Sequence, residues 1–173
     1  METGTKKDKE EYFFIGLRIH EENPDPEYYI LVFVGGEKDA PLTDDGKFLL
    51  FREGPFRKYV QENFGINILP KEFVEEIGMV CELGSSLDLL RNYSYDNSAE
   101  ILNTLNTLLD VIECLRLPMD KQAFRILEKL ADHLTFSREY GESYFNKDEM
   151  TRKENIDAYV SLMGWIFLNS KIV

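Results

Sequence analysis

Apolar residues in the first third of the chain follow the spacing of β-strands. In residues 13–19 they stand at every second position, which predicts a strand with one buried face. Residues 28–34 are apolar throughout and rich in β-branched and aromatic side chains, which is typical of a central strand covered on both faces. Residues 47–52 form a third such segment, and the short connections between the three favour antiparallel pairing.

The pattern then changes to that of a helix. Pro55 can open a helix because the first helical N–H has no partner within the helix. Phe56, Val60 and Phe64 follow at intervals of four residues, which places them on one face. Gly65 is suited to end the element, because glycine readily adopts the left-handed conformation found after helices.

Residues 70–90 predict three short elements. A proline and a glycine bound a helix over residues 70–78, and the next five residues, 79–83, suit a fourth strand. Ser85 and Ser86 could cap a brief helix that runs to residue 90.

The remainder of the chain, from residue 97 onward, has helical spacing. One straight apolar seam is formed by Ile101, Leu105, Leu108, Ile112 and Leu115. After a break at residues 118–120, a second helix carries Ala123, Leu127, Leu130 and Leu134, and the short connection makes the two helices an antiparallel hairpin. We expect the last helix to bury Ile156, Val160, Met163 and Phe167, with Trp165 and Leu168 widening that face.

These elements predict an α+β fold. A small antiparallel sheet of three or four strands comes from the N-terminal half and packs with a C-terminal helical bundle. Residues 1–10 are polar and charged, so we expect a disordered tail there. Residues 11–173 then form a single domain, with the strands within residues 11–84 and the helices within residues 85–173.

The charge balance narrows the range of partners. The chain has 173 residues, of which 32 are acidic and 20 are basic, which gives a formal net charge of −12. Nucleic acids and anionic membranes attract basic surfaces, so this balance argues against both. The excess is uneven, because residues 1–90 hold 19 acidic and 10 basic residues, whereas residues 91–173 hold 13 and 10. A basic protein partner would therefore meet the sheet half first, around residues 21–45.

The cysteines and the N-terminal segment indicate a cytoplasmic protein. Cys81 and Cys114 both occur in apolar surroundings, so we expect them to be small buried hydrophobic residues. Residues 1–10 lack the apolar stretch of a secretory signal, and no apolar run is long enough to span a membrane.

The loop over residues 37–46 is the first candidate for chemistry. Asp39, Asp44 and Asp45 supply three carboxylates that could bind a hard cation, but their spacing differs from that of an EF-hand. A hairpin connection explains the same residues, since Asp tolerates turn geometry and Gly46 supplies a positive φ. We therefore predict a turn, with no metal and no cofactor.

The two histidines are the remaining candidates for catalysis. His20 follows the first strand beside two glutamates, Glu21 and Glu22, in a setting typical of solvated charge. His133 lies near the end of a helix, and folding could bring it beside Glu139 or Glu142. No nucleophile elbow, phosphate-binding glycine loop or clustered zinc ligands occur in the chain, so a non-catalytic function is favoured.

Tyrosines in two polar segments, residues 91–97 and 138–145, stand beside Arg, Ser and Asn, a mixture that is common in recognition surfaces. Loop tyrosines that pack over the edge of a domain would give the same pattern. The predicted interaction surface consists of Glu21, Glu22, Asp39, Asp44, Asp45, Tyr93, Tyr95, Tyr140 and Tyr144.

Two functional hypotheses result. The first is a non-catalytic module that binds a basic protein, in the manner of an immunity protein or inhibitor, with long-range attraction speeding the encounter. The alternative is a small enzyme or ligand-binding domain, with a pocket between sheet and helices lined by tyrosines and carboxylates. The oligomeric state stays open.

Overall fold

The computed structural model describes residues 11–34, 39–52, 54, 56–68, 77–115 and 117–173. Within these residues the chain forms an α+β fold with six helices and seven strands. The strands are β1 (Glu11–Arg18), β2 (Tyr28–Val34), β3 (Ala40–Pro41), β4 (Thr43–Asp44), β5 (Lys47–Leu50), β6 (Ile77–Glu82) and β7 (Ser170–Ile172). The helices are α1 (Phe56–Phe64), α3 (Leu83–Arg91), α4 (Ser98–Leu115), α5 (Lys121–Phe136), α6 (Arg138–Phe145) and α7 (Glu149–Leu168).

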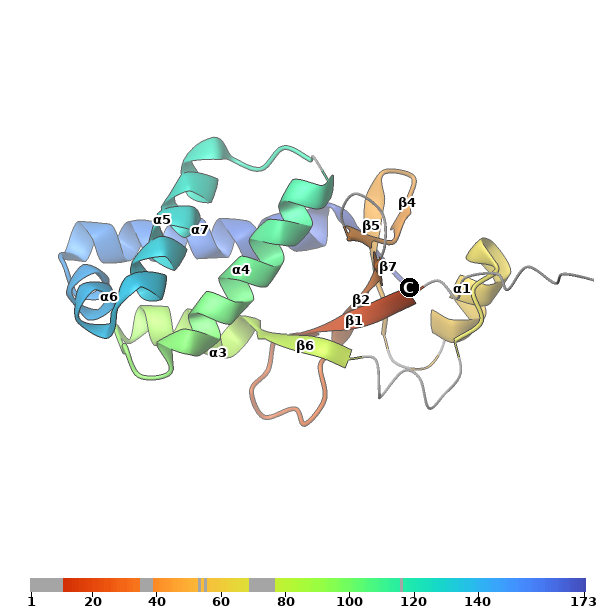
Figure 1. Ribbon diagram of the computed structural model, residues 1–173, viewed down its shortest axis with the longest axis horizontal. Helices are drawn as coiled ribbons and strands as arrows, with labels where there is room; N and C mark the ends of the chain where they lie inside the picture. Colours follow the sequence, from red (N-terminus) through yellow and green to blue (C-terminus); the bar gives the residue numbers. More distant parts are fainter. Residues whose placement is uncertain (1–10, 35–38, 53, 55, 69–76, 116) are drawn as a thin grey trace, which may run out of the picture.

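Two small sheets lie between the helices. The first has the order β3-β2-β1-β6 and the second the order β4-β5-β7. The predicted antiparallel pairing is confirmed for β1 with β2. The third predicted strand, β5, lies in the second sheet, where it pairs with β4, and it meets β2 only at an isolated antiparallel bridge between Tyr29 and Phe51. In contrast, β6 joins β1 in parallel and β7 joins β5 in parallel, because long stretches of chain separate the paired strands. Figure 1 shows the strands between α1 on one side and the remaining helices on the other.

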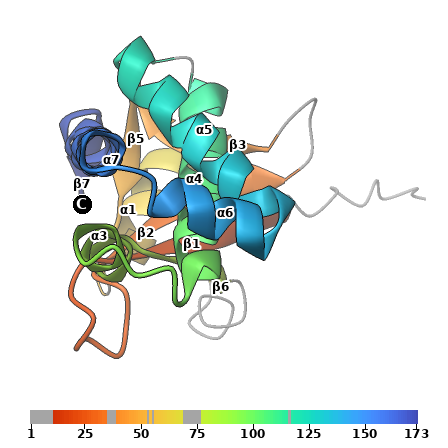
Figure 2. The same ribbon diagram turned by 90° about the vertical axis from the view of Figure 1, so that its left-hand side faces the viewer.

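Each face of the four-stranded sheet carries its own apolar core. Ile15 and Leu17 of β1 belong to the larger core, which they share with buried residues of α4, α5 and α7. Phe14, which points to the other face, packs with Phe56 and Val60 of α1. Viewed from the helical side, α5, α6 and α7 lie in front of the strands (Figure 2).

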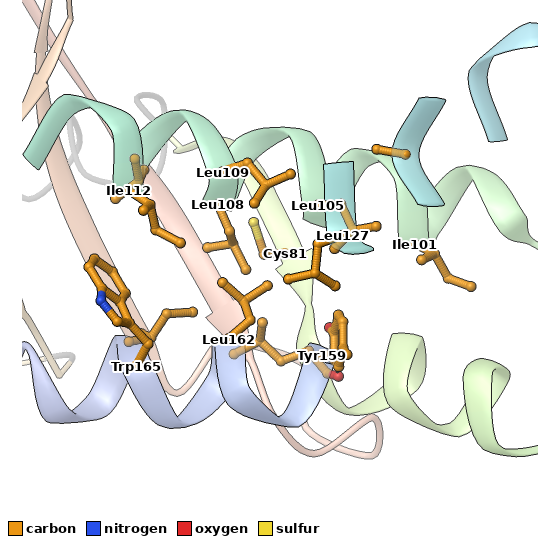
Figure 3. Packing of buried hydrophobic residues seen from close by; sticks show 14 of the residues in the cluster. Cys81, Ile101, Leu105, Leu108, Leu109, Ile112, Leu127, Tyr159, Leu162 and Trp165 are labelled. Atoms are coloured by element: carbon orange, nitrogen blue, oxygen red, sulfur yellow. The ribbon is translucent and has the colours of Figure 1, made fainter. Parts of the chain in front are cut away.

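The predicted seam of α4 is confirmed. Ile101, Leu105, Leu108 and Ile112 are all buried, and Leu115 packs against the same core. Figure 3 shows side chains of this seam pointing toward Tyr159, Leu162 and Trp165 of α7. The predicted face of α5 is confirmed as well, since Ala123, Leu127, Leu130 and Leu134 are buried.

The predicted face of α7 is confirmed only in part. Trp165 is buried as expected, and Ile156, Met163 and Phe167 are partly buried and pack against the larger core. The helix buries Ala158, Tyr159, Leu162, Trp165 and Ile166, whereas Val160 is 46% exposed and Leu168 is 78% exposed. Apolar residues surround most of this helix, so their spacing alone does not select the face that meets the core. The buried face of α7 is the one that packs against α3 and α5. The periodicity within α7 holds no information about where those two helices lie.

The elements around residues 55–90 are partly as predicted. Helix α1 begins at Phe56 and Gly65 follows it with a φ of 69°, as expected of a C-terminal glycine, whereas Pro55 lies outside the described residues. Most of the predicted helix at 70–78 also lies outside them, but Ile77 and Gly78 belong to β6. Helix α3 begins at Leu83, so the two serines are inside the helix and do not cap it.

The predicted tail, residues 1–10, lies outside the described residues. No helix in the described part of the chain is long and apolar enough to cross a membrane.

Candidate interaction surface

An apolar groove of about 450 Å³ lies between the four-stranded sheet and α4. All four strands of this sheet, or the residues next to them, contribute to it. One wall belongs to α4, and the groove is lined by Phe13, Ile15, Val32, Asp39, Pro41, Gly78, Met79, Thr107, Asp110, Val111 and Cys114. Because Ile15, Val32 and Val111 are also members of the larger core, the groove is a place where that core opens to solvent.

Helix α4 crosses the sheet from β6 to β3, and two hydrogen bonds fix its path. The Thr104 hydroxyl accepts from the backbone N–H of Glu82 at 3.1 Å, at the end of β6. The Cys114 thiol donates to the backbone carbonyl of Asp39 at 3.1 Å, just before β3. The groove follows the side of α4 between these two anchors.

Small and flexible side chains keep the β6 end of the groove open. A Cβ atom on Gly78 would lie 3.1 Å from the Phe13 ring, so any larger residue would crowd the floor. Met79 is 39% exposed, and its sulfur accepts a hydrogen bond from the Thr107 hydroxyl. Methionine adapts its shape to the group that packs on it, which suits a binding surface.

An acidic groove lies on the other side of α4, between α4 and α5. Its volume is also about 450 Å³, and its lining is Asn106, Leu109, Asp110, Glu113, Phe124, Glu128, Ala131 and Asp132. None of the described Lys or Arg residues forms an ion pair with Glu113, Glu128 or Asp132. Asp110 borders both grooves, so the exposed ridge of α4 separates an apolar surface from an acidic one.

The predicted acidic residues do not form one surface. Glu21 and Glu22 lie in the loop before β2, while Asp39 follows β2. The strand has seven residues, so the two groups are separated by about 20 Å along its length. Figure 1 shows the β1–β2 loop and the β4–β5 hairpin on opposite sides of the sheet.

Asp44 is already paired within the protein. Its carboxylate contacts Lys171 Nζ of β7 at 2.5 Å and accepts a hydrogen bond from the Tyr59 hydroxyl at 3.1 Å. These two hydrogen bonds, Lys171 first, lower the pKa of Asp44. Asp45 and Gly46 form the turn between β4 and β5 with φ angles of 52° and 76°, which confirms the predicted hairpin connection.

His20 is paired with Glu27 and not with the two glutamates beside it. Its Nδ1 lies 2.8 Å from Glu27 Oε1, and the same carboxylate accepts from the backbone N–H groups of Ile19 and His20 and from Asn23. Partial burial acts to raise the pKa of Glu27, but these hydrogen bonds outweigh it and hold the pKa at about 2. Glu27 therefore organises the β1–β2 loop, a role that the sequence analysis missed.

His133 contacts tyrosines and not the two candidate glutamates. Its ring stacks on those of Tyr140 and Tyr144, with centroids 4.7 and 3.7 Å apart. Its Nδ1 lies 2.7 Å from the carbonyl oxygen of Lys129, which can only accept, so Nδ1 carries the proton. Glu139 and Glu142 instead line a shallow hollow on α6 that His133 does not border.

The predicted tyrosines make most of their contacts within the protein. The Arg152 guanidinium lies 4.2 Å from the centre of the Tyr93 ring. Tyr95 packs edge-on against Phe145 at 6.2 Å, and Tyr144 is only 9% exposed, with burial raising its pKa. Tyr140 is the most exposed of the four, at 51%.

The two cysteines occupy different environments. Cys81 is buried as predicted, and burial raises its pKa to about 12. The expectation of burial is wrong for Cys114, which is partly exposed in the wall of the apolar groove. In the part of the chain that the structure describes, no three His, Cys, Asp or Glu side chains converge as a metal site.

Of the residues that line the two grooves, only Asp39 belongs to the interaction surface predicted from sequence, and Cys114 was expected to be buried. One signal was available in the predicted helical hairpin. Asp110 and Glu113 are three residues apart beside the α4 seam, and Glu128 and Asp132 are four apart on α5. Such spacing places each pair on one helix face, and antiparallel packing can bring the two faces together.

Comparisons with known proteins add information about the fold. No protein family matches the chain, and no curated protein is significantly similar to it. The crystal structure of the SatS C-terminal domain in complex with bromine is similar in fold, with a TM-score of 0.55 and 8% sequence identity. The similarity covers 94% of each chain, so it extends over the strands and the helices together.

Proposed function

We propose that the protein is a non-catalytic module that binds a basic partner protein through the two grooves beside α4. The observation that carries the proposal is the position of the apolar groove across α4 from Glu113, Glu128 and Asp132, three carboxylates that form no ion pair with the described Lys or Arg residues. An inhibitor that neutralises a basic toxin or nuclease is one concrete form of such a module.

The two grooves would contribute differently to binding. Burial of apolar side chains on Phe13, Met79 and Val111 would supply most of the affinity. The carboxylates of the acidic groove would attract Lys and Arg side chains, which accelerates association and discriminates between partners. The net charge of −12 favours the same partners at long range.

This proposal places the contact away from the residues expected from sequence. Of the predicted surface, Asp39 borders the apolar groove, whereas Glu21 and Glu22 lie at the far end of β2. Asp44 is engaged by Lys171, so it is less available to a partner. The contact would therefore be centred on α4.

Co-purification from the native host, quantified at low and high salt, tests the proposal. Met79→Lys should block the apolar groove and Glu128→Lys should remove attraction from the acidic groove, so both should lose a partner that the wild type retains at low salt. Glu22→Lys makes the same charge change at the sequence-predicted site and should retain the partner. Retention by both groove variants, or recovery of no partner with the wild type, would reject the proposal.

The volume of the apolar groove supports a second candidate function. About 450 Å³ is within the range of small-molecule sites, and Asp39 would favour an apolar ligand that carries an amine. Such a ligand would raise the melting temperature of the wild type but not that of Met79→Lys. No tyrosine lines this groove, unlike the pocket expected from sequence.

We also propose a cytoplasmic location. Cys81 and Cys114 are both free thiols. Free thiols are typical of proteins in reducing compartments such as the cytoplasm, where disulfides are rare.

A further inference from the structure

The apolar groove has the length of a short helical segment. Its α4 wall extends from Thr107 to Cys114, a rise of about 10 Å at 1.5 Å per residue. This distance corresponds to two turns of a second helix that lies alongside α4. The floor crosses from β6 through β1 to β2, so it presents the broad apolar face of a sheet.

The architecture of the molecule favours a helix at this position. Helices cover an apolar sheet face side by side in layered α+β folds, with neighbouring axes about 8–10 Å apart. Helix α4 covers the sheet on one side of the groove, and none of the described helices covers the floor at Phe13 and Met79. A helix placed there would extend the existing helical layer.

An added strand fits this surface less well. Peptides that bind by strand addition need free backbone groups at an edge of the sheet. At the β6 edge, the N–H of Glu82 already bonds to Thr104, and beside the β3 edge the carbonyl of Asp39 already accepts from Cys114. The side chains of Thr104 and Cys114 thus occupy one backbone group at or beside each edge of the four-stranded sheet.

We infer that the partner presents an amphipathic α-helix, which lies beside α4 with apolar residues at positions i, i+4 and i+7 in the groove. Lys or Arg residues on its flank reach across the ridge of α4 toward Glu113 in the acidic groove. This inference rests on the proposed function and specifies the form of the segment that the grooves recognise.

Two model peptides of identical composition test the inference. The first is a 15-residue, fluorescein-labelled peptide of Leu, Lys and Ala with Leu at helical spacing. The second rearranges the same residues so that Leu alternates with Lys at the spacing of a strand. We expect the helical peptide to bind the wild-type protein at least tenfold more tightly and to gain helical circular dichroism on binding.

Matched variants of the full chain locate the binding. Met79→Lys places a charge in the groove and should weaken binding of the helical peptide at least tenfold. Val160→Lys adds the same charge at an exposed site on α7 and should leave binding unchanged. Equal or tighter binding of the strand-spaced peptide at the Met79 site would overturn the helical inference and leave the proposed function intact. If neither peptide binds, or if Met79→Lys binds as well as the wild type, the proposed function fails and the inference fails with it.

Discussion

The thiol of Cys114 donates a hydrogen bond to the backbone carbonyl of Asp39, with 3.1 Å between sulfur and oxygen. The two residues are 75 positions apart, so the bond joins the end of α4 to the segment that leads into β3. Cys81, on strand β6, has no exposed surface. The protein thus carries one thiol at the edge of a groove and one inside the core.

The two thiols should differ in reactivity. In the folded protein at pH 8, Cys114 should react with a disulfide reagent such as dithionitrobenzoate, whereas Cys81 should not. Burial raises the pKa of Cys81 to about 12, so almost none of it is thiolate, and the reagent cannot reach it. Absorbance should report one reactive thiol before unfolding and two after it. Cys114→Ala should show none before unfolding, and equal rates for both thiols in the wild type would contradict the structure.

Two leucines of α7 should respond very differently to truncation. Leu162 has no exposed surface, so Leu162→Ala should lower the free energy of unfolding by about 2–5 kcal/mol. Leu168 is 78% exposed, so Leu168→Ala should change the free energy of unfolding by no more than about 0.5 kcal/mol. Urea unfolding of both variants measures this difference. A larger loss for Leu168→Ala would show that α7 buries the face first expected from its sequence.

Replacement by alanine should have opposite effects on the stability of the fold at two helical glycines, Gly84 and Gly164. A Cβ on Gly84 would overlap the backbone carbonyl oxygen of Ile19, so Gly84→Ala should destabilise the fold by about 1–3 kcal/mol. Nothing lies within 4 Å of a Cβ on Gly164, inside α7, so Gly164→Ala should stabilise the fold by up to about 1 kcal/mol. Thermal and urea unfolding give both values, and a neutral Gly84→Ala would refute the close contact between α3 and the end of β1.

The β1–β2 loop should loosen in acid. The pKa of Glu27 is about 2, below its ordinary value of 4.5, so its hydrogen bonds contribute fully above about pH 4.5 and are lost as the pH falls toward 2. The amide proton shifts of Ile19 and His20, followed by NMR, should titrate with a midpoint near 2. Glu27→Gln should remove this titration and Glu22→Gln should keep it. A midpoint near 4.5 in the wild type would mean that the carboxylate does not hold the loop.

Much of the fold is encoded in local patterns. The strands β1, β2 and β5 and the seam of α4 follow from the spacing of apolar residues. The spacing predicts one buried face for β1, however, whereas Phe14 and Ile15 are buried on opposite faces. The pattern fails at β7, where Ser170, Lys171 and Ile172 carry no strand signal. They pair with β5 only because α7 delivers them to its edge.

The candidate site was less predictable than the fold. The apolar groove combines residues of β1, β2 and β6 with residues of α4, which are far apart in the chain. No local spacing encodes how α4 crosses the sheet, and that crossing decides which apolar residues stay uncovered. For the same reason, the sequence offered Glu139 or Glu142 as possible neighbours of His133, whereas the fold stacks its ring on those of Tyr140 and Tyr144.

The pairing of β5 with β7 also has a consequence for how the molecule assembles. Phe48 pairs with Ser170, so all six described helices lie between the two strands in sequence, and each helix can form from local hydrogen bonds before the strands meet. Contacts between residues so distant in sequence form late, after the helices that connect them. Until then β4 and β5 form a two-stranded hairpin with both edges open, and the edge of β5 can mispair with a strand of another molecule during folding.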